Sequence, residues 1–185
     1  MKILKLSLLL LSITLISFAQ GFRQTQTDSY TRYELLKPSN QSFRIIYDVS
    51  ATTAGATNYF NGLRVGSEHL VDAVWDLMTG KELNWEIVNG IKAKENGLSN
   101  ANEAGEYLMV DLARPIPEGG QARLRIDKTY KDVNSYYQED GTIVFDRLLG
   151  IKRNSVVLPL GYELVGTNYP SQVTQEEDGR IKVSF

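Results

Sequence analysis

The stretch SFRIIYDV, residues 42–49, alternates apolar and polar side chains along most of its length. Successive side chains of an extended strand point to opposite faces, so every second residue shares a face. One face of this stretch is entirely apolar and consists of Phe43, Ile45, Tyr47 and Val49. A period of two with one apolar face predicts a β-strand whose apolar side is buried.

The same alternation recurs along the chain between turn signals. Strands are predicted in EYLMVDL (residues 106–112) and QARLRIDK (residues 121–128), which flank a turn rich in proline and glycine. Asp140-Gly141 and Asp178-Gly179 each precede another predicted strand, and Asp-Gly is a strong signal for a tight hairpin. About nine to ten short strands without a convincing amphipathic helix predict an all-β fold, an antiparallel β-sandwich.

Residues 69–90, HLVDAVWDLMTGKELNWEIVNG, are expected to form a hairpin around the Thr-Gly pair. If the apolar faces of both strands meet one core, Trp75 lies opposite Trp85 and Leu77 lies opposite Leu83. That register requires an odd-numbered loop, whereas a two-residue turn would move Trp75 to the other face. Because register follows the buried face, we expect the odd-numbered loop.

Two polar stretches are expected to lie outside the strands. Residues 20–29 are predicted to be a flexible lead, and residues 91–105 are rich in Asn, Gly and Ala and form the longest predicted loop. Residues 30–185 are then expected to form a single sandwich domain, which is long enough to bury a core. The last five residues, 181–185, are predicted to form a strand that runs to the end of the chain. That the domain is truncated at its C-terminus is therefore kept as an alternative.

The first 19 residues have the pattern of a secretory signal peptide. Lys2 and Lys5 precede an apolar run at residues 6–18, and small side chains occupy positions 17 and 19. An apolar run of about 13 residues is short of the roughly 20 that a membrane-spanning helix needs. We expect cleavage after Ala19 and export to the periplasm or the outside of the cell. Contact with the membrane is expected only through the signal peptide before cleavage.

Composition restricts the chemistry that the chain can perform. The chain has 22 acidic and 20 basic residues, a formal net charge of −2 and no basic tail, which argues against nucleic acid as a partner. It has no cysteine and one histidine, His69, so neither a zinc site nor a histidine-based catalytic triad is expected. No cofactor and no enzyme activity are expected. A glycosidase needs only two carboxylates, and acidic turns can bind calcium, so both of these stay open.

Tyrosines and basic residues gather around the predicted turns. The polar stretch at residues 128–141, KTYKDVNSYYQEDG, contains three tyrosines that either bind a sugar or a partner protein or cover the rim of the sandwich. The apolar stretch at residues 141–165 is interrupted by a charged turn, and its apolar character predicts strands covered on both faces. The candidate binding residues are Tyr136, Tyr137, Arg147, Lys152, Arg153 and Asn154, for an envelope protein or a glycan.

Three segments follow one another as strand, hairpin and strand–turn–strand: SFRIIYDVS (residues 42–50), AVWDLMTGKELNW (residues 73–85) and EYLMVDLARPIPEGGQARLRIDKTYKD (residues 106–132). This layout resembles the non-catalytic N-terminal β-domain of aminopeptidase N-type zinc peptidases, over about half of the chain. The His-Glu-x-x-His and Gly-x-Met-x-Asn motifs of that family are absent from the sequence. The resemblance therefore implies an accessory sandwich and assigns no catalytic residue.

Together these observations predict an exported β-sandwich that acts as a binding or scaffold module in a bacterial envelope. The alternatives are a carboxylate-based glycosidase and an accessory domain of a larger metallopeptidase.

Overall fold

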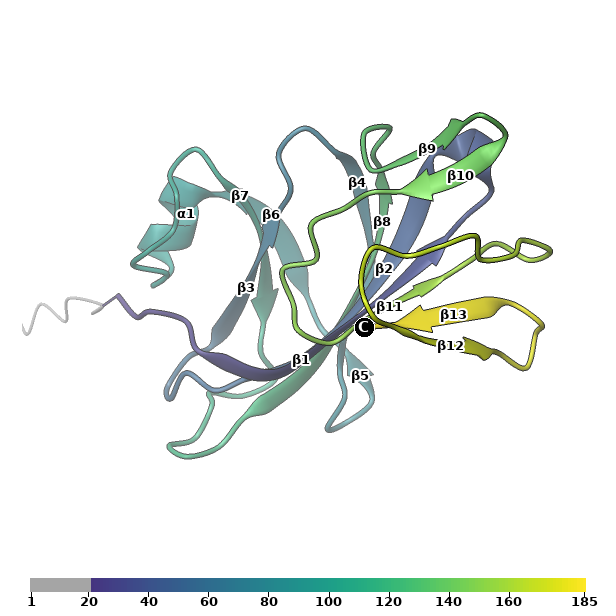
Figure 1. Cartoon of the computed structure of the whole chain (residues 1–185). Coiled ribbons are helices and arrows are strands. Elements are labelled where there is room, and N and C mark those ends of the chain that lie inside the picture. Colours follow the sequence, from purple (N-terminus) through teal and green to yellow (C-terminus); the bar gives the residue numbers. More distant parts are fainter. Residues whose placement is uncertain (1–20) are drawn as a thin grey trace, which may run out of the picture.

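The computed structural model describes residues 21–185, so the predicted signal peptide lies outside the described residues. The chain forms one large sheet, one small sheet and a separate hairpin (Figure 1). The large sheet has eight strands, in the spatial order β12 (Gln172–Gln175), β13 (Ile181–Ser184), β11 (Asn154–Val157), β1 (Gln26–Leu35), β2 (Ser42–Ala51), β8 (Ala122–Lys131), β4 (Glu68–Asp76) and β5 (Lys81–Glu82). The small sheet consists of β3 (Asn58–Leu63), β7 (Glu106–Asp111) and β6 (Trp85–Asn89). The remaining elements are the hairpin β9 (Tyr136–Glu139) and β10 (Thr142–Phe145), the 3-10 turn η1 (Pro38–Asn40) and helix α1 (Gly90–Glu95).

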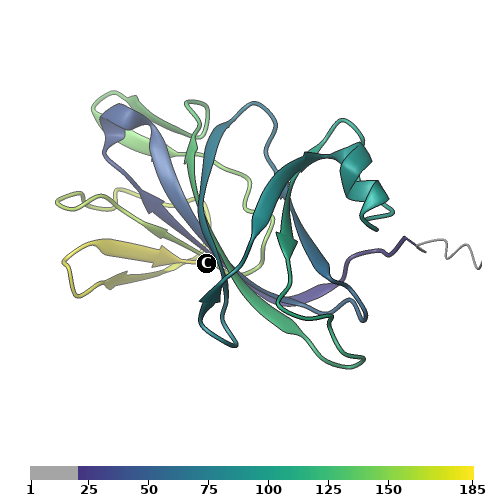
Figure 2. The ribbon, with the colours of Figure 1, turned by 180° about the vertical axis from the view of Figure 1, so that it is seen from behind.

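Both smaller units pack on the same face of the large sheet. The small sheet covers one end of β2, where the Tyr47 and Tyr59 hydroxyls lie 3.4 Å apart. The β9–β10 hairpin covers the other end, where the Phe145 ring centre lies 5.2 Å from that of Phe43. Figure 2 shows this division from behind, with the small sheet and α1 on one side and the C-terminal strands on the other. The predicted β-sandwich is confirmed, but it has thirteen strands among the described residues, more than the nine to ten expected.

The predicted inward face of residues 42–49 is confirmed. Phe43, Ile45, Tyr47 and Val49 are all buried in one core cluster between the layers. Burial of a large apolar side chain stabilises a fold by roughly 1.5–3 kcal/mol. The alternation of this one strand therefore accounts for a substantial part of the free energy that holds the layers together.

The opposite face of the large sheet carries ion pairs between neighbouring strands. Arg125 on β8 lies opposite Asp48 on β2, and its Nε atom donates to the carboxylate at 2.7 Å. Arg44 on β2 pairs diagonally with Asp127 on β8, because the residue directly opposite Arg44 is Thr129. Cross-strand pairs of opposite charge stabilise a sheet modestly and keep its outer face soluble.

The predicted register of the hairpin at residues 69–90 is wrong. Trp75 lies opposite Glu82, on the outer face, and Trp85 begins a strand of the other sheet. The cause is a β-bulge at Asp72, which inserts one extra residue between the pairs that Val71 and Ala73 make with β8. A bulge reverses the alternation after it, and the strand buries Val74 instead of Trp75.

The segment at residues 91–105 is more ordered than a loop, because α1 lies at its start. The Asn89 side chain caps this helix by accepting a hydrogen bond from the Lys92 backbone N–H at 2.9 Å. The helix and the following turn cover the outer face of the small sheet with a second apolar cluster of Phe60, Val88, Ala93, Leu98, Ala101 and Met109. Periodicity missed this helix because it is only six residues long.

The sandwich begins earlier than expected, since β1 starts at Gln26, inside the predicted lead. Residues before β1 also contribute: the Gln24 side chain bonds both the N–H and the C=O of Phe60 on β3, at 2.7 and 2.8 Å. An amide side chain thus occupies the edge of β3 in place of another strand, which protects that edge from unwanted pairing.

The turn predictions for the second half of the chain hold. Asp140 and Gly141 both have positive φ, 47° and 78°, as a two-residue hairpin turn between Glu139 and Thr142 requires. All four residues of β11 are buried, as expected for a strand covered on both faces. The strand expected after the charged turn in residues 141–165 is short, however, because β11 ends at Val157 and residues 158–171 contain no regular element.

Candidate functional site

Arg147, one of the predicted site residues, lies just after β10 with its side chain only 9% exposed. Its guanidinium carbon lies 5.1 Å from the ring centre of Phe43, 5.5 Å from that of Tyr130 and 6.0 Å from that of Tyr33. A guanidinium over aromatic faces is stabilised by the negative charge of the π systems. Residues of β1, β2 and β8 thus fix the start of the long connection to β11.

The charge of Arg147 is balanced by Asp132, at the end of β8. The Asp132 carboxylate accepts hydrogen bonds from the Ser135 hydroxyl at 2.7 Å and from Arg147 Nη1 at 3.3 Å. Arg64 Nη1 lies 3.5 Å from the same oxygen. Burial opposes ionisation of Asp132, but the Ser135 hydrogen bond and the Arg64 charge outweigh it and hold its pKa below 3.8. Two arginines therefore share one ionised carboxylate.

The two predicted tyrosines on β9 have different environments. Tyr136 is buried, and its hydroxyl donates to the Leu36 carbonyl oxygen at 2.9 Å. Burial, together with the nearby Tyr162 phenol, raises the pKa of Tyr136 to about 12. Tyr137 lies half-buried opposite Val144. Tyr136 thus supports the aromatic core beside Phe145, and only Tyr137 of the pair reaches the surface.

The three predicted residues of the charged turn before β11 also differ in their exposure to solvent. Lys152 is exposed, and Arg153 forms an ion pair with Asp28 of β1. Asn154 is buried, and its amide donates to the Ile151 carbonyl oxygen within the turn. The six predicted residues therefore do not form one surface: Tyr136, Arg147 and Asn154 point into the protein, whereas Lys152, Arg153 and Tyr137 are accessible.

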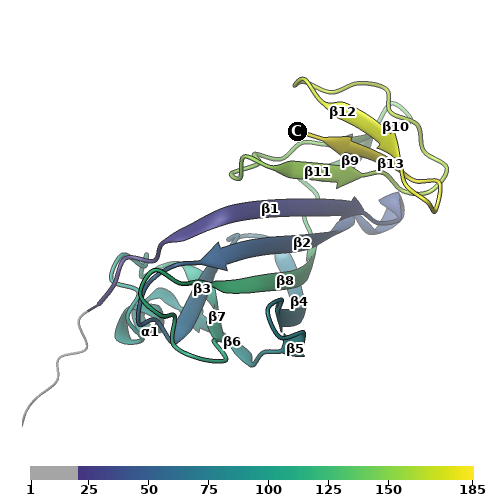
Figure 3. The same ribbon diagram turned by 90° about the horizontal axis from the view of Figure 1, so that it is seen from below.

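A surface feature that sequence reasoning missed lies in residues 148–173, here called the apolar segment. Five large apolar side chains in it are at least half exposed: Leu148 (94%), Leu160 (69%), Val165 (86%), Tyr169 (75%) and Val173 (50%). Among the large apolar side chains of the described residues outside this segment, only Val65 and Leu70 are more than 60% exposed. A signal was present, because Pro159, Gly161 and Gly166 interrupt the apolar run after residue 157 and argue against a continuous strand. Figure 3 shows β11, β12 and β13 together at the end of the large sheet to which this segment connects.

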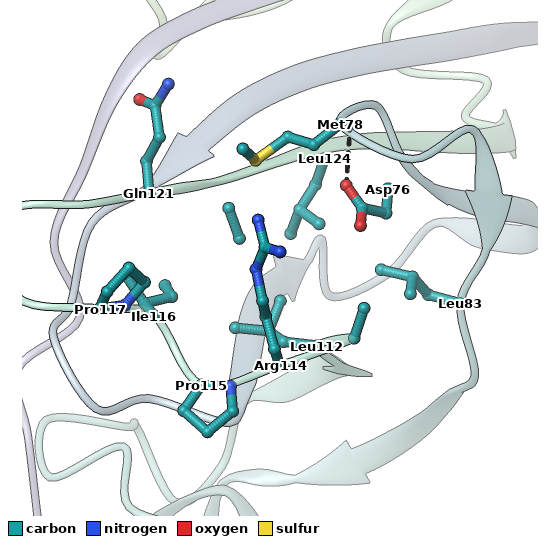
Figure 4. A pocket seen from close by; sticks show the side chains of 12 residues that line it. Asp76, Met78, Leu83, Leu112, Arg114, Pro115, Ile116, Pro117, Gln121 and Leu124 are labelled. Carbon is teal, nitrogen blue, oxygen red and sulfur yellow. Dashed lines mark hydrogen bonds between the residues drawn. The ribbon is translucent and has the colours of Figure 1, made fainter.

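A crevice opens at the opposite end of the sandwich, between the β4–β5 turn and the loop before β8 (Figure 4). Its floor is apolar, with Leu83, Ile116 and Leu124, and Arg114 stands at its rim. Its volume of about 10 Å³ suffices for about one water molecule. The Asp76 carboxylate at its edge accepts bonds from the Met78 N–H and the Thr79 hydroxyl of its own turn. The crevice is therefore too small for a substrate.

His69 and the acidic turns make no cluster of ligands. His69 Nε2 lies 3.5 Å from Glu106 Oε2, and Glu176 is held by Arg32. Across residues 21–185, no three His, Asp or Glu side chains meet in an arrangement that could hold a metal ion. Within the same residues, no helix has the length and apolar character needed to cross a bilayer.

Comparisons with known proteins bear on the fold. No protein-family model and no curated protein sequence matches the chain. Among solved structures, the M1 zinc metallopeptidase of Deinococcus radiodurans matches 90% of this chain at 13% identity and a TM-score of 0.56. A variant of that enzyme bound to a Tyr-Ser-Ala substrate matches 88% of the chain with a TM-score of 0.55.

This chain corresponds to 39% of the length of each of those two structures. A two-domain M1 zinc metallopeptidase variant bound to L-arginine matches equally well, with a TM-score of 0.56 over 90% of this chain and 40% of the other. At 13% identity the similarity concerns the fold. The chain thus has the fold of part of the M1, aminopeptidase N-type, zinc metallopeptidases, which confirms the resemblance inferred from the sequence.

Proposed function

We propose that this chain is a non-catalytic β-sandwich that works by docking on another protein in the bacterial envelope. The observation that carries the proposal is the apolar segment. Exposed apolar area gains about 25 cal/mol per Å² when it leaves water. Large apolar side chains that are left exposed together in one segment of a soluble protein are typical of an interaction site.

The composition of the apolar segment favours a protein over a glycan as the partner. Its most exposed side chains, Leu148 and Val165, are aliphatic. Sugars bind mainly by stacking on aromatic rings, whereas the centre of a protein interface is apolar and well packed. The aromatic member, Tyr169, suits a protein interface equally, since tyrosine is enriched there.

Export is part of the proposal and is supported by the sequence of residues 1–19. A charged start, a short apolar run and small residues before the expected cleavage after Ala19 are the pattern of a secretory signal peptide. A single domain without cysteine folds in the periplasm without disulfide bonds.

The first test is site-specific photo-crosslinking in the bacterium that produces the protein. A photoreactive amino acid is placed at position 165, and at position 65 as a control, because Val65 is 79% exposed but lies outside the apolar segment. We expect one dominant protein crosslinked from position 165 and none from position 65. Equal crosslinking from both positions contradicts the proposal.

The second test uses the crosslinked protein in purified form. Binding is measured by isothermal titration calorimetry with the unmodified chain, with Leu160→Asp/Val165→Asp, and with Val65→Asp. We expect the double variant to bind at least tenfold more weakly and the control to bind normally. Unchanged affinity of the double variant refutes a role for the apolar segment. If position 165 crosslinks only to a second copy of this chain, the proposal that the partner is another protein is refuted.

A second candidate function is that of an accessory domain for a metallopeptidase. It is favoured by the fold similarity, because a fold like this one takes up about two-fifths of the matching peptidase chains. The partner would then be a zinc-binding domain, either in the same polypeptide or in another. Sequencing the transcript beyond the codon for Phe185 tests the first arrangement, which predicts a His-Glu-x-x-His motif downstream.

A further inference from the structure

Lys128 is an unusual residue for its place in the fold. It lies on the inward face of β8, between Ile126 and Tyr130, and is only 5% exposed. Its Nζ atom donates to Asn61 Oδ1 on β3 at 2.6 Å and lies 5.3 Å from the Tyr130 ring centre. Among the described residues, no carboxylate lies within 4 Å of this ammonium group.

A buried ammonium group normally has an anionic partner, because removing it from water is costly. It has three hydrogen-bond donors, and only one of them, to Asn61, is accounted for by a protein atom. Burial, reinforced by the charge of Arg147, lowers the pKa of Lys128 to about 8. The group therefore remains mostly charged at neutral pH, although the fold provides no counter-ion.

Two arginines lie near Lys128. The Arg147 guanidinium contacts the Tyr130 ring, and the Arg64 guanidinium lies beside Asp132, the carboxylate that also pairs with Arg147. Lys128, Arg147 and Arg64, here called the cationic cluster, carry three positive charges. The buried carboxylate of Asp132 serves both arginines and leaves the cluster with excess positive charge.

The cationic cluster lies near one end of the sandwich, where its Arg64 member reaches the surface. On the inner face of β3, Tyr59 and Leu63 are buried, but Asn61 between them is only half-buried. The Arg64 side chain, in the connection that follows, is 46% exposed. Asn61, which bonds Lys128, is thus partly open to solvent, and the charged side chain of Arg64 lies at the surface at this end.

Two further titratable groups near the Tyr130 ring are His69 and Glu106. The His69 ring centre lies 5.7 Å from that of Tyr130, and its Nε2 atom lies 3.5 Å from Glu106 Oε2. The Glu106 side chain is half exposed to solvent. Because it lies beside His69 and not within 4 Å of Lys128, it leaves the ammonium group without a counter-ion.

We propose that the cationic cluster is a binding site for a carboxylate group, which passes Asn61 and Arg64 and pairs with Lys128. A carboxylate can accept the two hydrogen bonds that Lys128 leaves unused, and charge-assisted hydrogen bonds of this kind are strong. The carboxylate belongs either to a small organic acid or to the C-terminus of a peptide. This site is separate from the apolar segment, and it does not depend on the docking proposal.

The test measures acetate binding to the full chain by NMR, following the Cε resonance of Lys128, which is assigned with Lys128→Met. We expect saturating acetate to raise the pKa of Lys128, because an anion stabilises the ammonium form. Lys131→Met is the matched control, since Lys131 lies on the same strand but is exposed and pairs with Glu68. Arg64→Gln changes only a half-exposed side chain. If Lys128→Met fails to fold, this variant tests whether the surface member of the cationic cluster contributes to acetate binding.

The variants are compared through the side-chain amide resonance of Asn61, which all of them keep. We expect the acetate affinity to fall at least tenfold in Lys128→Met, severalfold in Arg64→Gln and not at all in Lys131→Met. The affinity should also fall as the pH rises from 7 to 9.5, as Lys128 loses its proton. A dipeptide with a free C-terminus that binds more tightly than acetate, and than its own amide, identifies a peptide ligand. An unshifted Lys128 resonance, or inorganic phosphate that binds more tightly than any carboxylate, overturns the proposal.

Discussion

Replacement of Lys128 by methionine should stabilise the protein at neutral pH. The folded-state pKa of about 8 lies well below the ordinary value of 10.5, and each pKa unit corresponds to about 1.4 kcal/mol. The charged lysine therefore costs the fold roughly 3 kcal/mol at pH 7. Loss of the hydrogen bond to Asn61 offsets about 1 kcal/mol of the gain. The net expectation for Lys128→Met is a free energy of unfolding about 2 kcal/mol higher.

The pH dependence of this effect separates it from simple repacking. Because the folded state lowers the pKa of a basic group, the penalty is complete below pH 8 and disappears as the pH rises towards 10.5. The stability of the unmodified protein relative to Lys128→Met should therefore increase by about 2 kcal/mol between pH 7 and pH 9.5.

Urea denaturation followed by tryptophan fluorescence, in carboxylate-free buffer at both pH values, measures the difference. Lys131→Met is again the control and should show no such pH dependence. A constant difference between Lys128→Met and the unmodified protein at pH 7 and 9.5 would refute the reasoning.

Two further predictions concern packing and ion pairing. Gly90→Ala should lower the free energy of unfolding by about 1–3 kcal/mol, because the added Cβ would lie 1.8 Å from the Asn102 carbonyl oxygen. Gly150→Ala, which meets nothing within 4 Å, is the matched control in the same urea experiment and should change little. Asp132→Asn should cost about 3 kcal/mol at pH 7, because it leaves Arg147 buried without its counter-ion. Since the pKa of Asp132 is lowered in the fold, its stabilisation is lost as the pH falls through that pKa, so acid denaturation curves of Asp132→Asn should be flatter below pH 4.

The sequence predicted those parts of the fold that depend on neighbouring residues. The inward face of β2 and the Asp140-Gly141 turn follow from alternation and local backbone preference, and both are correct. The register around Trp75 failed because a bulge at Asp72 depends on pairing with β8, a strand about 50 residues away in the chain. Such an insertion leaves no mark on local periodicity.

The candidate site was predictable only in part, for a related reason. Arg147 was selected from its sequence neighbourhood, but its burial depends on Tyr33 and Phe43, which are distant in the chain. Lys128 could have been detected from the sequence, because it occupies the next inward-facing position after Leu124 and Ile126 and yet is charged. A charge in phase with a buried face breaks the usual pattern, and such exceptions concentrate at functional sites.

The pairing of β1 with β11 has a consequence for how the protein folds. These strands are parallel and join chain regions far apart, as the hydrogen bond between Tyr30 and Ser155, 125 positions away, illustrates. Contacts at such separation form slowly, because a large loop must close before they contribute. Until β11 has been synthesised, β1 has a neighbour on one side only. We therefore expect the large sheet to close late and in a slow kinetic phase, after the local hairpins have formed.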